Sequence, residues 1–116
     1  MNIAERVEGD VTVLLPAGRI DTQAAAELDR ALQAVLAAGK SRLVMDMAKV
    51  DFISSAGLRT LAAVLVRSRA EGGDLKLCGL NTRVARVFNI IGFDVLMSIH
   101  ETPEAAVAGF SSSAAT

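Results

Sequence analysis

The spacing of apolar residues changes along the chain between a period of two and a helical period. Residues 2–8 and 11–15 alternate between apolar and polar positions on either side of the turn sequence Glu8-Gly9-Asp10, which predicts a β-hairpin. Further along, apolar residues recur every three or four positions, as on the buried face of a helix. These helical segments alternate with short apolar runs. The pattern predicts an α/β domain with the element order ββαβαβαβα.

Four helices are expected from this spacing and from their end signals. Asp21 or Thr22 can cap the first helix, Asn81 can cap the third, and Thr102-Pro103-Glu104 begins the last. The apolar faces of the first three helices are Leu28, Leu32, Val35 and Leu36; Leu58, Leu61, Leu65 and Val66; and Val84, Val87, Phe88 and Ile91.

Three more strands are predicted, at residues 42–47, around 75–80 and at 94–99, with 49–53 leading into a pair of serines. No linker or repeat divides the chain, so residues 1–116 are expected to form one domain. Its ordered part should be about residues 3–110, with 111–116 as a frayed tail. The predicted core is Leu28, Leu32, Val35, Leu43, Met45, Leu61, Leu65, Leu77, Val87 and Phe88.

Composition narrows the range of ligands. Apolar residues make up 52% of the 116 residues, but aromatic residues only 3%, so the core must be aliphatic. The 12 Lys and Arg are scattered among 13 Asp and Glu, which argues against the basic stripe that nucleic-acid binding requires. The scarcity of aromatic side chains also removes a stacking platform for single strands. We therefore expect no nucleic acid as partner.

The single cysteine and the character of the N-terminus point to the cytoplasm. Cys78 cannot form an internal disulfide, which suits a reducing compartment. Residues 1–5 have neither the basic start nor the apolar run of a signal peptide, and no apolar stretch approaches the length of a membrane span. A cytoplasmic protein without direct membrane contact is predicted.

Catalysis is disfavoured by the residues available. His100 is the only histidine, and a surface position explains it more simply than a role as general base. The segment Ile53-Ser54-Ser55-Ala56-Gly57 has Ile53 where a nucleophile elbow needs glycine. No Cys/His cluster has the spacing of metal ligands, and no glycine-rich loop carries a phosphate-binding lysine. We expect a protein that is not an enzyme and has no cofactor or metal.

The paired serines are the most informative feature. They precede a helix, so one of them is expected to be its N-cap, while the other presents a hydroxyl that can be modified. Asp21 and Asp46 also lie near strand ends. Because function in open α/β sheets gathers beyond the carboxyl ends of the strands, we expect Asp21, Asp46 and Ser55 to cluster there. Caps or loop acids are the simpler alternative for both aspartates.

Two segments together resemble a known family. Val44-Met45-Asp46-Met47 followed by Val50-Asp51-Phe52-Ile53-Ser54-Ser55-Ala56-Gly57-Leu58-Arg59, with the earlier Gly18-Arg19-Ile20-Asp21, resemble the STAS domain of bacterial anti-sigma factor antagonists. The resemblance covers about residues 3–110. It implies a mixed sheet of about five strands with about four helices packed mainly on one side.

The resemblance also implies a mechanism, called partner switching. The unmodified antagonist binds an anti-sigma factor that is a serine kinase and so releases the sigma factor; phosphorylation dissociates the complex, and a metal-dependent serine phosphatase reverses it. The serine two residues before the motif glycine is Ser55, with Ser54 as second candidate. Ser54 and Ala56 depart from the common Asp-Ser-Ser-Gly-Leu form. The partner-binding residues implied are Asp21, Asp46, Ser54, Ser55, Ala56, Gly57, Leu58 and Arg59.

Two other functions stay open at this point. One keeps the kinase and phosphatase but has an output other than a sigma factor, such as control of secretion. The other is an accessory subunit of a membrane complex that transports lipids or anions, because STAS domains also serve there. A serine at position 55 favours phosphoregulation over a purely structural subunit.

Overall fold

The computed structural model describes the backbone of residues 1–114 and the side chains of residues 1–110. Within this range six strands form one sheet: β1 (Asn2–Glu8), β2 (Val11–Ile20), β3 (Arg42–Asp46), β4 (Lys49–Ile53), β5 (Asp74–Cys78) and β6 (Ser98–His100). The helices are α1 (Thr22–Ala37), α2 (Ser55–Ala70), α3 (Thr82–Ile91), α4 (Phe93–Leu96) and α5 (Pro103–Ala114). The predicted mixed α/β fold is confirmed.

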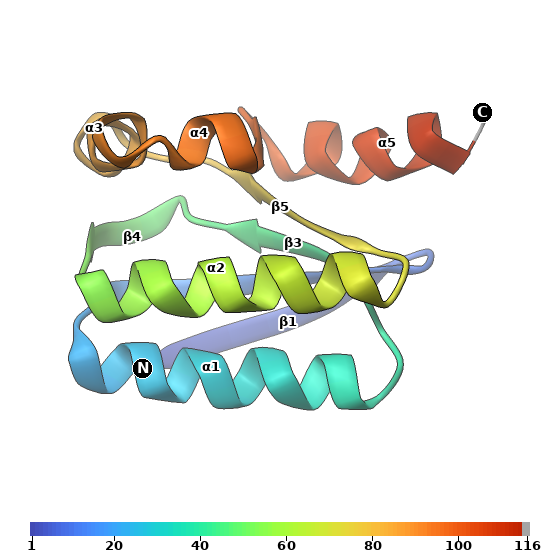
Figure 1. The fold of residues 1–116 in the computed structure, drawn as a ribbon, viewed down its shortest axis with the longest axis horizontal. Coiled ribbons are helices and arrows are strands. Elements are labelled where there is room, and N and C mark those ends of the chain that lie inside the picture. Colours follow the sequence, from blue (N-terminus) through green and yellow to red (C-terminus); the bar gives the residue numbers. More distant parts are fainter. Residues whose placement is uncertain (115–116) are drawn as a thin grey trace.

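The sheet is mixed because only its first strand runs against the others. β1 pairs antiparallel with β2, and the remaining pairs, β2–β3, β2–β4, β3–β5 and β5–β6, are parallel. β3 lies beside Thr12–Leu14 and β4 beside Ala17–Ile20, so the two strands lie along β2 in succession (Figure 1). Together they form one strand that is interrupted at Met47 and Ala48.

Most helices cover one face of the sheet. The main core joins α1, α2 and α3 to that face; nine of the ten predicted core residues are buried, and only Val87 is half-buried. α5 covers the opposite face, where Ala106 and Phe110 pack on a smaller cluster that comprises Val11, Val13, Val44 and Cys78. The expectation that helices pack mainly on one side is confirmed.

The structure differs from the predicted elements in three places. Lys49–Ile53, which had been assigned to no element, is a strand. Residues 93–96 are helical, where a strand was predicted: Gly92 has φ +80°, which ends α3, and Phe93 then packs edge-on against Phe88. α5 extends to Ala114, so helical backbone continues into residues 111–114 of the segment expected to be a frayed tail. Residues 115–116 lie outside the described range, and the fraying of this segment stays a prediction.

Candidate functional site

The two serines have different structural roles. Ser54 is the N-cap of α2: its hydroxyl oxygen accepts a hydrogen bond from the Gly57 amide at 3.2 Å, and its own amide donates to the Ile20 carbonyl at 2.8 Å. Ser55 is the first residue of the helix and is exposed. The second hydrogen bond connects Ser54 to β2 and keeps its backbone extended, as an N-cap requires. Ser54 is therefore the serine that caps α2. The side chain of Ser55 makes no capping bond and is exposed to solvent.

Gly57 is required by packing. A Cβ atom at this position would lie 2.7 Å from a side-chain carbon of Ile53 and 2.8 Å from one of Ile20. Such distances are shorter than any ordinary carbon–carbon contact. The absence of a side chain lets the first turn of α2 rest directly on β2 and β4.

Asp21 lies beside the serines. It is the N-cap of α1, and its carboxylate accepts from the Ala24 amide at 2.8 Å. Ile20 pairs with Ile53 in the parallel register of β2 and β4, so Asp21 and Ser54 follow neighbouring strand ends. The predicted proximity of Asp21 to Ser55 at the carboxyl ends of these strands is therefore present.

Asp46 does not join this cluster. β3 ends beside the middle of β2, because Leu14 pairs with Met45, whereas β4 ends beside Ile20. The end of β3 and the end of β4 are therefore five to six residues apart along β2, which is roughly 15–20 Å at the rise of a strand. Asp46 accepts from the Ala48 amide at 3.0 Å and so stabilises the interruption between β3 and β4. Asp46 is the last residue of β3, and its role in partner binding stays a prediction.

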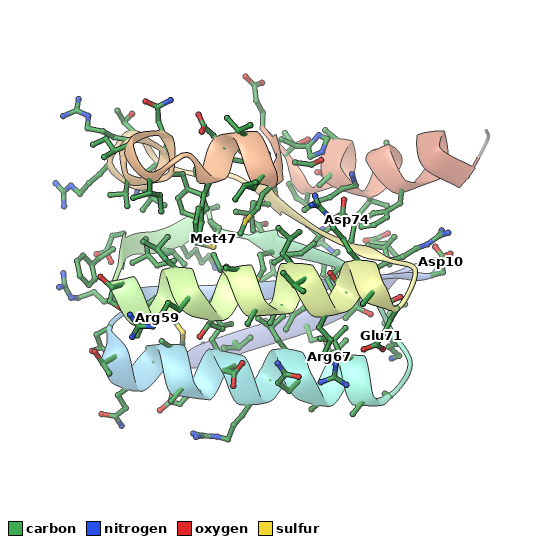
Figure 2. The ribbon with its side chains drawn as sticks, in the orientation of Figure 1. Asp10, Met47, Arg59, Arg67, Glu71 and Asp74 are labelled. Atoms are coloured by element: carbon green, nitrogen blue, oxygen red, sulfur yellow. The ribbon has the colours of Figure 1, made fainter. Side chains whose placement is uncertain are left out.

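The other predicted residues of the motif divide between packing and exposure. Ala56 and Leu58 pack in part against the main core, while Arg59 is exposed one turn after Ser55. Figure 2 shows Arg59 in the N-terminal half of α2 and Arg67 near its other end, where its Nε lies 2.8 Å from a carboxylate oxygen of Glu71. Among the described residues no ion pair includes Arg59. Its charge is available to a partner.

One feature of this end of the molecule was not predicted. The guanidinium of Arg19 lies 4.2 Å from the centroid of the Phe52 ring, and the two residues are paired in β2 and β4. Arg19 is exposed and Phe52 half-buried. The residues are 33 positions apart in the chain, so only the parallel register of these two strands brings them together. They add a cation and an aromatic ring to the surface next to Ser54.

Cys78 and His100 lie on the face of the sheet that α5 covers, and the pKa of each is shifted. Burial raises the pKa of the Cys78 thiol to about 12, and the charges of Asp46 and Glu104 contribute in the same direction. Burial, followed by the positive charge of Lys76, lowers the pKa of His100. The Nε2 atom of His100 is buried and has no hydrogen-bond partner within the described residues. These groups lie in β5 and β6, whereas Ser55 follows β4.

Residues 1–110 contain no group of three or more His, Cys, Asp or Glu side chains placed to hold a metal ion. None of the helices in the described part of the chain is both long and apolar enough to cross a membrane.

Comparison with known proteins identifies the class of protein. Residues 2–106 match the STAS domain family, and the chain belongs to that family. It is 35% identical to the BtrV protein of Bordetella bronchiseptica over 106 residues, which cover 91% of this chain and 90% of BtrV. Identity to the anti-sigma-F factor antagonist RsfB of Mycobacterium tuberculosis is 33% over 102 residues, which cover 85% of this chain and 80% of RsfB.

A solved structure agrees with this assignment. The crystal structure of an anti-sigma factor antagonist from Mycobacterium paratuberculosis superposes with a TM-score of 0.85, at 27% identity, over 93% of this chain and 92% of that one. Anti-sigma factor antagonists with this domain are regulatory binding proteins and not enzymes. The prediction of a binding protein is thereby confirmed.

Proposed function

We propose that this chain is an anti-sigma factor antagonist that binds its anti-sigma factor at the N-terminal end of α2. Support comes from the names of its relatives, such as RsfB, and from the surface itself. Ser55 and Arg59 are exposed there, next to Asp21 and to the Arg19–Phe52 pair. This end of the sheet thus offers neutral, charged and aromatic contacts within one area.

We further propose that the anti-sigma factor is a serine kinase and that it phosphorylates Ser55. The observation that carries it is the division of roles: Ser54 caps the helix, so the exposed Ser55 hydroxyl can change without loss of the cap. A phosphoserine carries about −1.5 to −2 charges at pH 7. The N-terminus of a helix stabilises negative charge, so the fold should tolerate the modification.

The same charge should weaken the complex. A partner surface that fits a neutral hydroxyl would have to accept a desolvated phosphate, and a penalty of roughly 3–4 kcal/mol reduces affinity by two to three orders of magnitude. A serine phosphatase would restore binding, and the cycle would take place in the cytoplasm. No change of fold is needed for this switch.

The test is phosphate incorporation from labelled ATP by the purified anti-sigma factor kinase of the source organism. Ser55→Ala should abolish incorporation, because the target oxygen is gone, while partner binding stays near that of the wild type. Ser54→Ala is the matched control, and it should keep most of the label. If Ser55→Ala protein is still labelled and Ser54→Ala protein is not, the target is Ser54 and the proposed division of roles is wrong.

A further inference from the structure

Two side chains that can carry positive charge lie between α5 and the sheet. In the parallel register of β5 and β6, Lys76 pairs with Ser98 and Cys78 pairs with His100. Residues two apart in a strand point to the same face. Because Cys78 belongs to the cluster beneath α5, Lys76 and His100 also face that helix. Lys76 is only 7% exposed, and His100 is half-buried.

The backbone of α5 rests on both of these side chains at Gly109. A Cβ atom at this position would lie 3.3 Å from Cε of Lys76 and 3.4 Å from Cε1 of His100. The next residue, Phe110, has its ring centroid 4.9 Å from Nζ of Lys76. The packing of α5 on the sheet therefore includes direct contact with both side chains.

Lys76 has partners for its charge, whereas His100 has none for one of its ring nitrogens. Nζ of Lys76 lies 3.7 Å from a carboxylate oxygen of Asp74 and 3.5 Å from the Ser98 hydroxyl. Nε2 of His100 is buried and has no hydrogen-bond partner within the described residues. An imidazolium carries a proton on both ring nitrogens. Protonation would therefore leave a buried, charged N–H group without an acceptor, which costs free energy.

The charges around His100 add to this cost. Lys76 of β5 opposes a second positive charge on the imidazole. Cys78, which is paired with His100, stays neutral because its pKa is raised to about 12. In the described part of the chain, no carboxylate forms an ion pair with His100. The carboxylates on the elements that surround it are Asp74 of β5, Asp94 of α4, Glu101 before α5 and Glu104 of α5.

We propose that His100 makes α5 a pH-sensitive latch, in which the neutral imidazole permits the helix to pack on the sheet and the protonated imidazole loosens it. Release of α5 would expose Cys78 together with Val11, Val13 and Val44, which lie in the same cluster. The inference is independent of any partner and of phosphorylation at Ser55.

The direction of the pH dependence follows from the environment of His100. Burial, followed by the charge of Lys76, lowers the pKa of His100 below its ordinary value of 6.5. The closed form therefore binds a proton less readily than the open form, in which the imidazole is solvated. The packing of α5 is at its most stable above pH 6.5 and loses stability as the pH falls through that value.

The chain supplies its own probes for this latch, because it contains one histidine and one cysteine. Cys78 is fully buried, so its rate of reaction with a dipyridyl disulfide measures local opening. His100→Gln is the matched control, since an amide does not titrate in this range. The ratio of the wild-type rate to the His100→Gln rate should rise roughly threefold or more from about pH 7.5 to about pH 5.5. The fraction of thiolate in the open form cancels in this ratio.

Amide hydrogen exchange separates release of α5 from unfolding of the whole domain. Relative to the His100→Gln protein, exchange in α5 of the wild type should become faster over the same pH range, while exchange in α1 should not change. An equal increase in α1 and α5 would overturn the latch in favour of global unfolding. If His100→Gln protein does not fold, His100→Asn serves as the control.

Two further results would contradict the proposal. One is a rate ratio that does not change with pH. The other is a nuclear magnetic resonance titration in which the single imidazole of the wild type protonates at or above its ordinary pKa of 6.5. Titration below that value is the result expected of the latch.

Discussion

The N-termini of α1 and α2 begin in the same way. Each follows the end of a strand, and each has a cap whose side-chain oxygen accepts from the amide three residues later: Asp21 at 2.8 Å and Ser54 at 3.2 Å. The first helical residue, Thr22 or Ser55, is exposed in both. The strands β2 and β4 are paired, so the two helix starts are neighbours.

They differ in charge and in how closely they are packed. The cap of α1 is a carboxylate, whereas that of α2 is a neutral hydroxyl. The third helical residue is Ala24 in α1 but Gly57 in α2, where β2 and β4 leave no room for a Cβ atom. The comparison shows that α2 starts with a neutral cap and with closer packing against the sheet than α1. A negative charge added at Ser55 can therefore change binding while the fold stays the same.

The largest expected effect is at the third helical residue. Gly57→Ala should destabilise the protein by about 1–3 kcal/mol, because the added methyl group overlaps Ile20 and Ile53. Helix propensity alone predicts a gain of about 1 kcal/mol for the same change. Ala24→Gly is the reciprocal control and should cost about 1 kcal/mol. Urea denaturation of both proteins measures these values, and a more stable Gly57→Ala protein would contradict the packing account.

The caps should have similar, smaller effects. Asp21→Ala and Ser54→Ala are each expected to cost about 0.5–2 kcal/mol, because each leaves a helical amide without its acceptor. Ser55→Ala should cost less, since its side chain makes no capping bond. Thermal unfolding of the three variants checks this order. A loss with Ser55→Ala that exceeds the loss with Ser54→Ala would mean that the cap is misassigned.

The smallest stability change is expected from added charge at the first helical residue. Thr22→Asp and Ser55→Asp should each unfold within about 1 kcal/mol of the wild type, because the helix dipole favours an acid there. The gain at Thr22 should be the smaller one, since Asp21 already supplies a charge. Melting curves at low and high salt measure both. A collapse of either melting temperature would show that the helix start does not tolerate charge.

Most of the fold follows from local sequence patterns, and the exceptions are places where distant contacts decide. The buried faces of α1, α2 and α3 were predicted from the spacing of residues such as Leu28, Leu61 and Phe88, because burial imposes that spacing directly. Val66 and Ile91 fit the same spacing and were wrongly placed on these faces, since both are exposed. Val95 and Leu96 were predicted to be in a strand, since an apolar run there resembles one. The turn at Gly92 and the contact between Phe93 and Phe88 instead make this segment helical.

The candidate site was only partly predicted, because long-range contacts also decide its details. The serine pair was recognised from its motif, but its sequence is compatible with either serine as cap. The hydrogen bond from Ser54 to Ile20 decides between them, and it joins residues 34 positions apart. Asp46 was placed in the cluster because the break between β3 and β4 was not predicted.

The most direct test of the charge switch is a calorimetric titration of the wild type, Ser55→Asp and Val7→Asp against the purified anti-sigma factor kinase, with melting curves of all three. Ser55→Asp should bind at least tenfold more weakly than the wild type, which corresponds to about 1.4 kcal/mol, and should melt at nearly the same temperature. Val7→Asp should bind like the wild type. Equal affinities of the Ser55→Asp and wild-type proteins would contradict the claim that charge at Ser55 controls the complex.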